Sequence, residues 1–309
     1  MAEAELAFPV IDFAPFASPA RTPADAAARA ACVARIDAVA RHSGAFYLAN
    51  HGVDEGLIAR LLELDRRFYA LPAPERTKIL APSGMSGGYQ PRDHFNEAFF
   101  ASVIREHTPG VDYSAFGANQ WPASLPSLEP TAMEFTEQMN ALGERLLGAI
   151  ALGLGVDEHH FAPLFGAGAL QTLQLRYYAP ERAGANLLGP HYDLPPLSFI
   201  VQDERGGLEG LCDGKWAPVP PLPGTIVCQI GEAMLRWTND RFVANLHQVI
   251  HQPGHARYSL VYCLAPRLDA SMACLPACCD DEHPPRYEPM SFAEFVAEYV
   301  AAQAAKGKQ

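Results

Sequence analysis

The strongest constraint on the fold is a series of short apolar runs in the second half of the chain. Turns rich in proline and glycine, such as residues 220–224 and 252–254, separate these runs. Many short strands with turn residues between them are typical of an antiparallel sandwich or barrel. We therefore predict a mainly β fold for this half. The strand-like runs lie at residues 173–178, 198–202, 225–230, 246–251 and 259–264.

Helical patterns dominate the first half of the chain and return at its end. Each expected helix begins at a capping residue or ends at a glycine. Helices are expected after Thr22 and Pro23, after Asp54, around residues 133–150 and after Ser291, and short strands at residues 8–12 and 45–49. The prediction is a β core with flanking helices. It divides into a helical N-terminal region, residues 1–125, and a β-rich core with a C-terminal helix, residues 126–309.

Residues 83–121 are rich in glycine, proline and polar residues and show little periodicity. A long irregular stretch inside a compact domain is often a functional loop. We expect this segment to be a lid whose aromatic side chains, including Tyr89 and Phe99, close over a site and exclude water. The alternative is a surface excursion whose aromatic residues pack on the outside of the β core.

The charge of the chain argues against two classes of partner. Its 309 residues include 23 Lys and Arg against 35 Asp and Glu, which gives a formal net charge of −12. Such a surface repels nucleic-acid phosphates and anionic lipid. No apolar run approaches the ~20 residues that span a bilayer, and the N-terminus lacks the basic region of a secretory signal. We expect a cytoplasmic protein with neither nucleic acid nor membrane as a partner.

Most of the seven cysteines stand alone in the sequence, which fits a reducing compartment. The exception is the group Cys274, Cys278 and Cys279, with His283 close behind. Zinc binding here is disfavoured, because adjacent cysteines rarely both bind one tetrahedral metal. We expect a loop with unpaired thiols.

His191 and Asp193 are the first candidate metal ligands. Residues i and i+2 of a strand face the same side, so the imidazole and the carboxylate would converge. Two histidines and one carboxylate on one face of a metal are typical of non-haem Fe(II) oxygenases. His247 and His251 are both candidates for the second histidine, since both would face the same side of an uninterrupted strand. Spacing alone does not choose between them.

Arg257 and Ser259 form another pair at positions i and i+2. A guanidinium group beside a hydroxyl group is suited to bidentate binding of a carboxylate. Without further context, Arg257 would be an ordinary surface arginine.

Together these residues resemble the isopenicillin N synthase-like family of Fe(II)- and 2-oxoglutarate-dependent dioxygenases. The resemblance covers most of the chain, and in the core the order and spacing of the motifs match over roughly 90 residues. The segments that carry it are residues 9–12, 44–53, 88–91, 96–99, 175–180, 191–193, 202–203, 207–208, 216–219, 223–224, 230–232, 236–239, 245–249 and 257–259.

The resemblance implies a double-stranded β-helix, or jelly roll, with helices packed outside. It also implies that His191, Asp193 and His247 bind Fe(II) and that His251 does not. The resemblance to the family thus selects His247 over His251, between which spacing alone does not decide.

The resemblance further implies a cosubstrate site. Arg257 and Ser259 match the pair that binds the distal carboxylate of 2-oxoglutarate, and Tyr178 matches a tyrosine that often contacts the same carboxylate. The implied reaction uses Fe(II), 2-oxoglutarate and O2, with ascorbate as an optional reductant. It oxidises an unactivated C–H bond of a small molecule, by hydroxylation or by desaturation or cyclisation, and releases succinate and CO2.

Two other functions are compatible with the same motifs. One is an Fe(II) oxidase of the isopenicillin N synthase type that does not use 2-oxoglutarate and still keeps the Arg-x-Ser pair. The other is a non-catalytic jelly-roll binding protein, against which the complete set of three metal ligands argues.

Arg176 departs from the family pattern, because many plant members carry Asn at the matching position. Two roles are open for it. It could face the pocket and bind a carboxylate of the substrate, or it could form a structural salt bridge across the sheet.

Overall fold

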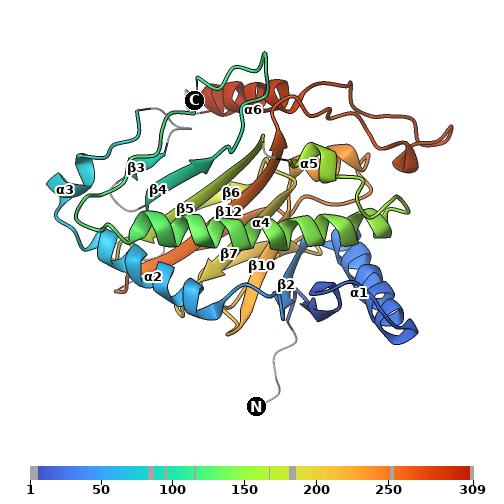
Figure 1. The fold of residues 1–309 in the computed structure, drawn as a ribbon, viewed down its shortest axis with the longest axis horizontal. Coiled ribbons are helices and arrows are strands. Elements are labelled where there is room, and N and C mark those ends of the chain that lie inside the picture. Colours follow the sequence, from blue (N-terminus) through green and yellow to red (C-terminus); the bar gives the residue numbers. More distant parts are fainter. Residues whose placement is uncertain are drawn as a thin grey trace.

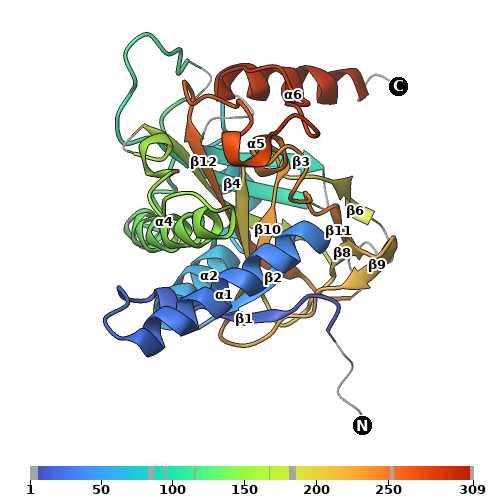
Figure 2. The ribbon, with the colours of Figure 1, turned by 90° about the vertical axis from the view of Figure 1, so that its right-hand side faces the viewer.

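Two β-sheets face each other, and helices cover the outside of the larger one (Figures 1 and 2). The structure, a computed structural model, describes residues 6–82, 87–93, 96–114, 116–166, 168–180, 186–250 and 254–306. The larger sheet contains β1 (Val10–Asp12), β2 (Ala45–Ala49), β3 (Gly88–Asp93), β4 (Asn96–Val103), β5 (Ala169–Tyr178), β7 (Leu197–Gln202), β10 (Thr225–Ile230) and β12 (Arg257–Arg267). The smaller sheet contains β6 (Asn186–His191), β8 (Leu208–Cys212), β9 (Lys215–Pro218) and β11 (His247–Ile250).

The order of the strands shows how the chain crosses between the sheets. The larger sheet runs β1-β2-β10-β7-β12-β5-β4-β3 and the smaller one β6-β11-β8-β9. Apart from the parallel pair β1 and β2, neighbouring strands in these sheets run antiparallel. The prediction of a mainly β fold with flanking helices is confirmed.

The described helices are α1 (Pro23–His42), α2 (Glu55–Tyr69), α3 (Ala73–Thr77), α4 (Leu128–Gly153), α5 (Glu232–Trp237) and α6 (Phe292–Lys306), and short 3-10 turns lie at Ala14–Phe16, Ala162–Leu164 and Pro276–Cys278. Three of the described helices, α1, α2 and α6, begin at the capping residues that the sequence predicts. At the start of α1, the Thr22 hydroxyl accepts from the Asp25 amide at 3.1 Å and the Asp25 carboxylate accepts from the Thr22 amide at 2.9 Å. The same reciprocal pair joins Ser291 and Glu294 before α6. These bonds satisfy amides that the first helical turn leaves without partners.

Helices α2 and α4 lie against the outer face of the larger sheet, while α6 lies across one end of the two sheets (Figures 1 and 2). The side chains of β5 alternate between the core beneath the helices and the space between the two sheets. Leu173 and Leu175 are fully buried in the core beneath the helices. Gln174 and Arg176 face the space between the sheets. A single strand therefore contributes both to the core and to the interior of the barrel.

The prediction of an irregular lid in residues 83–121 is wrong for β3 and β4, which occupy the first half of the segment. β4 pairs with β5 over eight residues, from Asn96 opposite Tyr178 to Val103 opposite Gln171. β3 pairs with β4 and extends the same sheet. Neighbouring residues on both faces of β4 are apolar. The sequence therefore lacks the alternation of apolar and polar residues that is typical of a strand with one face exposed to solvent. Pairing with a distant strand decides the structure here.

The aromatic side chains of this segment divide between the two faces. Phe99 is buried with its ring centroid 5.2 Å from that of Phe68 on α2, and Tyr89 is buried with its hydroxyl bonded to Glu97. Phe100, the next residue on β4, lines the interior cavity instead. Tyr89 and Phe99 therefore pack beneath the helices and not over the metal centre. This is the packing on the outside of the β core that the alternative predicts, and the lid role is wrong for these two residues.

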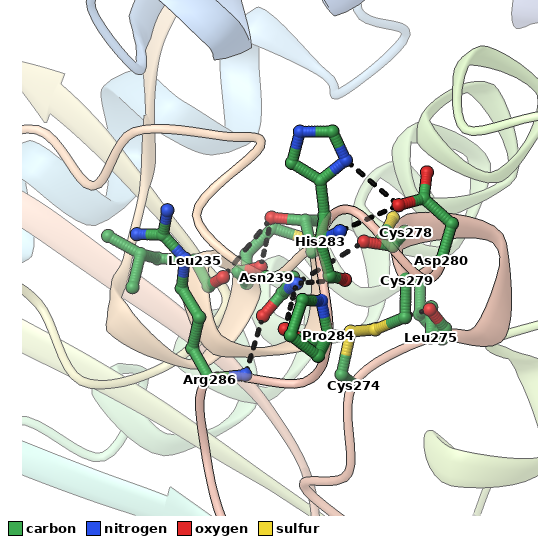
Figure 3. The surroundings of a disulfide bond; sticks show 12 residues. Leu235, Asn239, Cys274, Leu275, Cys278, Cys279, Asp280, His283, Pro284 and Arg286 are labelled. Carbon is green, nitrogen blue, oxygen red and sulfur yellow. Dashed lines mark hydrogen bonds and ion pairs between the residues drawn. A yellow bond between two sulfur atoms is a disulfide. The ribbon is translucent and has the colours of Figure 1, made fainter.

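Cys274 and Cys279 form a disulfide, which corrects the prediction of unpaired thiols (Figure 3). The turn at Pro276–Cys278 brings the two ends of the loop together. Asn239 stabilises the loop. Its side-chain amide nitrogen donates to the carbonyl oxygens of Cys278 at 3.4 Å and Pro284 at 3.1 Å. Among the described residues, the groups of three side chains that could bind a metal do not include Cys274, Cys278 or Cys279. The free cysteines are Cys32, Cys212, Cys228, Cys263 and Cys278.

Strands from both predicted regions, residues 1–125 and 126–309, share the larger sheet. β2 pairs with β10, and β4 pairs with β5. Among the described helices, none combines the length and the apolar character that crossing a bilayer requires.

Candidate metal centre and active-site cavity

His191, Asp193 and His247 come together between the two sheets. His191 ends β6, His247 begins β11, and the two residues lie opposite each other in the ladder. The Nε2 atoms of His191 and His247 lie 4.0 Å and 3.9 Å from the two carboxylate oxygens of Asp193. The three ligand atoms all lie within 4.8 Å of one another, so they could bind one metal ion. His251, the alternative histidine, lies outside the described residues.

Asp193 reaches this position in a way that the sequence did not predict. β6 ends at His191, so Asp193 lies beyond the strand and not on the same strand face. A loop fixed by the start of α5 carries it instead: the Glu232 amide donates to the Asp193 carbonyl at 2.8 Å, and the Ala233 amide donates to the Leu194 carbonyl at 3.1 Å. The predicted convergence is correct, but its structural cause is a loop that packs against a distant helix.

Gly231 allows this loop to lie close to α5. A Cβ atom at position 231 would lie 2.0 Å from the Pro195 carbonyl oxygen and 2.5 Å from that of Asp193. Such approaches are far shorter than van der Waals contact, and both involve backbone atoms that cannot rotate away. Gly231 is a positioning residue that the sequence analysis missed, although the Ile-Gly-Glu motif around it was part of the family resemblance.

We predict that Gly231→Ala displaces the Asp193 loop. Metal affinity should fall about 10- to 100-fold, as is typical when a group that orients a metal ligand is lost, and stability should fall by about 1–3 kcal/mol from overpacking. Fe(II) titration and thermal unfolding measure the two effects. Gly166→Ala is the matched control, because a Cβ atom there meets nothing within 4 Å. Unchanged metal affinity in Gly231→Ala would show that the loop tolerates the shift.

Hydrogen bonds fix the protonation of both imidazole rings. The Nδ1 atom of His191 lies 2.8 Å from the Gly189 carbonyl oxygen, and that of His247 lies 3.1 Å from the Asn245 carbonyl oxygen. A carbonyl oxygen only accepts, so each Nδ1 carries the proton and donates it. Each Nε2 therefore has a lone pair available for a metal.

Asp193 completes a donor set that fits Fe(II). Its Oδ2 atom is buried and has no hydrogen-bond partner among the described residues. Leaving a buried carboxylate oxygen without a partner is costly unless a ligand satisfies it. Two imidazole nitrogens and one carboxylate oxygen on one side are the ligands that non-haem Fe(II) favours.

The local electrostatics keep both ligand types in their metal-binding forms. Burial lowers the pKa of His191, and the nearby His247 imidazole lowers it further. Burial alone would raise the pKa of Asp193, but His247 and His191 offset this, and the net pKa is below its ordinary value. A neutral imidazole and an ionised carboxylate are the forms that bind a metal ion.

A small pocket extends from the three candidate ligands to Arg257. This arginine is 2% exposed, and its guanidinium group lies 4.8 Å from the centre of the Tyr178 ring. Its Nε donates to the Gly206 carbonyl at 2.6 Å and its Nη1 donates to the Ser259 hydroxyl at 3.1 Å. The structure thus brings together all three residues that the sequence assigns to the cosubstrate, and it holds the guanidinium group in place before any ligand binds.

A cavity of about 490 Å³ opens on the other side of the candidate metal ligands. His191, Asp193, Gln174 and Arg176 line both this cavity and the small pocket. The candidate metal centre therefore lies between two compartments. The cavity wall comes from β4, β5, β6, β12 and α6, with Phe100, Ser102, Leu170, Thr172, Gln174, Arg176, Gly189, Leu194, Pro195, Cys263, Ala265, Phe292, Val296 and Tyr299 beside the metal ligands.

Comparison with known proteins decides the family. The sequence profile of the 2OG-Fe(II) oxygenase superfamily matches residues 169–266, and that of the non-haem dioxygenase in morphine synthesis N-terminal region matches residues 8–124. A 2-oxoglutarate-Fe(II) type oxidoreductase of Emericella nidulans is 30% identical, over 93% of this chain and 88% of its own length. The chain belongs to the 2-oxoglutarate/Fe(II) oxygenase superfamily.

Further relatives of this oxygenase agree in sequence and in fold. Gibberellin 20 oxidase 2 of Oryza sativa subsp. japonica is 28% identical over 97% of this chain and 78% of its own length. A 2OG-Fe(II) oxygenase family protein from Caulobacter crescentus superposes with a TM-score of 0.85 at 26% identity, over 96% of this chain and 99% of that one. A Neurospora crassa protein, solved in complex with alpha-KG and 5-formyluracil, has the same fold, with a TM-score of 0.85 at 24% identity over 98% of both chains.

The family resemblance and the jelly-roll fold predicted from the sequence are thereby confirmed. The oxygenase is an Fe(II)- and 2-oxoglutarate-dependent oxidoreductase with O2 as co-substrate. The Neurospora crassa protein holds a small molecule, 5-formyluracil, in its complex. The comparisons do not favour an oxidase that dispenses with 2-oxoglutarate.

Proposed function

We propose that His191, Asp193 and His247 bind the Fe(II) of this oxygenase. The observation that carries the proposal is the buried Asp193 carboxylate, whose Oδ2 atom has no hydrogen-bond partner among the described residues. Its two oxygens lie 3.9–4.0 Å from the Nε2 atoms of His247 and His191, and the protons of these imidazoles lie on the opposite side of each ring. Bound Fe(II) supplies the redox chemistry with O2 and leaves coordination positions open for the cosubstrate. The three side chains contribute charge, orientation and a fixed location.

We further propose that Arg257 binds the distal carboxylate of 2-oxoglutarate, together with Ser259 and Tyr178. A buried guanidinium group that lines a pocket is suited to an anion, because burying a charge without a direct ion pair is costly. Asp203 is close enough for Arg257 to lower its pKa, but its carboxylate bonds to the backbone amides of Arg205 and Tyr258. The hydrogen bond from Arg257 to Ser259 aligns both polar groups toward one ligand. The cosubstrate would then lie between Arg257 and the iron.

The substrate is proposed to bind in the cavity of about 490 Å³, whose wall is mostly apolar and whose inner end is the candidate metal centre. That volume is typical of small-molecule sites. Side chains from α6, including Phe292 and Val296, cover the cavity and reduce access of water. Oxidation of an unactivated C–H bond, the cytoplasmic location, the absence of nucleic-acid and membrane partners, and the division at residue 125 stay predictions.

Removal of the metal or of the cosubstrate should each stop the reaction. We predict that succinate release, measured against a panel of amino acids and small carboxylates, disappears after chelation and returns when Fe(II) is added. Omission of 2-oxoglutarate should have the same effect as omission of Fe(II). Substrate oxidation that continues without 2-oxoglutarate would instead support the oxidase of the isopenicillin N synthase type.

A further inference from the structure

Arg176 is a buried cation that makes no direct ion pair with a described residue, although it is close enough to Asp193 to help lower the pKa of that carboxyl group. It is 7% exposed, and none of the ion pairs between described residues includes it. Its Nε donates to the Gln174 side-chain oxygen at 2.9 Å, while its Nη1 is buried with no hydrogen-bond partner in the described part of the chain. The salt bridge across the sheet, one of the two roles that the sequence left open, is therefore absent from these residues. Asp193 is the proposed ligand of the metal, so its charge would be used there, and the guanidinium group of Arg176 is left to bind an anion from outside.

The guanidinium group of Arg176 lies on the side of the substrate cavity. It sits 5.6 Å from the centre of the Phe100 ring, and Phe100 lines the large cavity but not the small pocket. Tyr178, two residues further along β5, lines the small pocket but not the large cavity. Arg176 therefore stands at the junction of the two compartments with its charge beside the larger one.

The composition of the cavity wall limits what kind of anion would fit. Arg176 contributes the one lysine or arginine side chain among the described residues that line it. A single guanidinium group balances a single negative charge, and its planar fork matches the two oxygens of a carboxylate. Most of the remaining wall is apolar, with Leu170, Leu194, Ala265, Phe292 and Val296 as examples.

We propose that the substrate of this oxygenase is a monocarboxylate with an apolar body, and that Arg176 is the residue that selects its carboxylate. The inference rests on the proposed function, because it takes the larger cavity as the substrate site. The apolar body would occupy the space beneath α6, and the carboxylate would lie beside the metal centre. The C–H bond that reacts would then be close to the carboxylate end of the substrate.

Binding of matched acid and amide probes tests this proposal. The wild-type protein, loaded with Fe(II) and 2-oxoglutarate without oxygen, is titrated by calorimetry with 1-naphthylacetate and 1-naphthylacetamide, and with phenylacetate and phenylacetamide. Each pair has the same shape and differs in charge. A charge-assisted hydrogen bond predicts that the acid binds about 10- to 100-fold more tightly than the amide. In Arg176→Gln the preference should shrink to within about 3-fold, mainly through weaker binding of the acid.

Two further variants separate charge recognition from structure. Arg176→Lys keeps the charge without the planar fork and should keep part of the preference for the acid. Arg105→Gln removes one positive charge from a half-exposed side chain outside the cavity and should leave the preference unchanged.

The outcomes distinguish this inference from the proposed function. A wild-type protein that binds neither Fe(II) nor 2-oxoglutarate overturns both. A wild-type protein that binds both, but prefers the acid in neither pair of probes, overturns only the role of Arg176. The role is also overturned if Arg176→Gln weakens binding of Fe(II) or 2-oxoglutarate while the preference for the acid survives, since Arg176 would then support the metal or the cosubstrate.

Discussion

His247→Ala is expected to abolish turnover that depends on Fe(II) and 2-oxoglutarate. The substitution removes one of three proposed ligands and leaves the buried Asp193 carboxylate with one imidazole partner. Loss of a group that merely orients a ligand costs about 10- to 100-fold in metal affinity, so loss of the ligand itself should cost about 100-fold or more. Fe(II) titration and succinate release measure the two effects. His191→Ala and Asp193→Ala should behave alike.

Controls for this prediction address both folding and the choice of histidine. Thermal unfolding should show that the variants remain folded, because the site lies beside an open cavity and not in the core beneath the helices. His159→Ala, at an exposed position, should leave metal binding unchanged. Full activity in His247→Ala, combined with loss in His251→Ala, would transfer the ligand role to His251.

Arg257→Ala should raise the requirement for 2-oxoglutarate sharply. Removing one partner of a buried, hydrogen-bonded charge pair costs about 2–5 kcal/mol, which corresponds to an increase of about 30-fold or more in the apparent KM for 2-oxoglutarate. Steady-state kinetics at saturating substrate measure this change. Arg257→Lys should recover only part of the loss, because an ammonium group cannot bind a carboxylate through two parallel hydrogen bonds.

A matched control separates this effect from a general loss of positive charge. Arg205 directly precedes Gly206, whose carbonyl accepts from Arg257, but its own side chain is half-exposed. Arg205→Ala should therefore leave the apparent KM unchanged. Because Arg257→Ala also loses the bond to Gly206, thermal unfolding must accompany the kinetics. An unchanged requirement for 2-oxoglutarate in a folded Arg257→Ala protein would assign the carboxylate to another residue.

Sequence patterns predicted the elements whose signals are local. β10 has the predicted bounds, and α1 and α6 begin at the capping residues Thr22 and Ser291. Such caps act within one helical turn, so neighbouring residues suffice to predict them. β3 and β4 were missed because their pairing with β5 joins residues far apart in the chain. The disulfide between Cys274 and Cys279 likewise depends on the turn that lies between them.

In the candidate site too, residue spacing predicted some features, while others depend on contacts between residues that are far apart in the chain. Spacing predicted that His191 and Asp193 converge, but it could not reveal that contacts with α5 hold Asp193 in place. Spacing also left His247 and His251 as equal alternatives, and the choice came from the family resemblance. The position of His247 depends on its pairing with His191 across the smaller sheet, which no local pattern encodes.

Every second side chain of β5 faces the interior of the barrel. The substrate range of the oxygenase can therefore be altered by substituting one of these interior residues at a time. Tyr178 faces the small pocket, Arg176 the junction, and Thr172 and Leu170 the more distant wall of the cavity. Neighbouring interior positions on a strand are about 7 Å apart. Each of these side chains would therefore contact a different part of a bound molecule along its length. Smaller residues at 170 or 172 should admit longer substrates, while the sites proposed for the substrate carboxylate and for the cosubstrate stay unchanged. New substrate ranges could then evolve without any change in the chemistry at the iron.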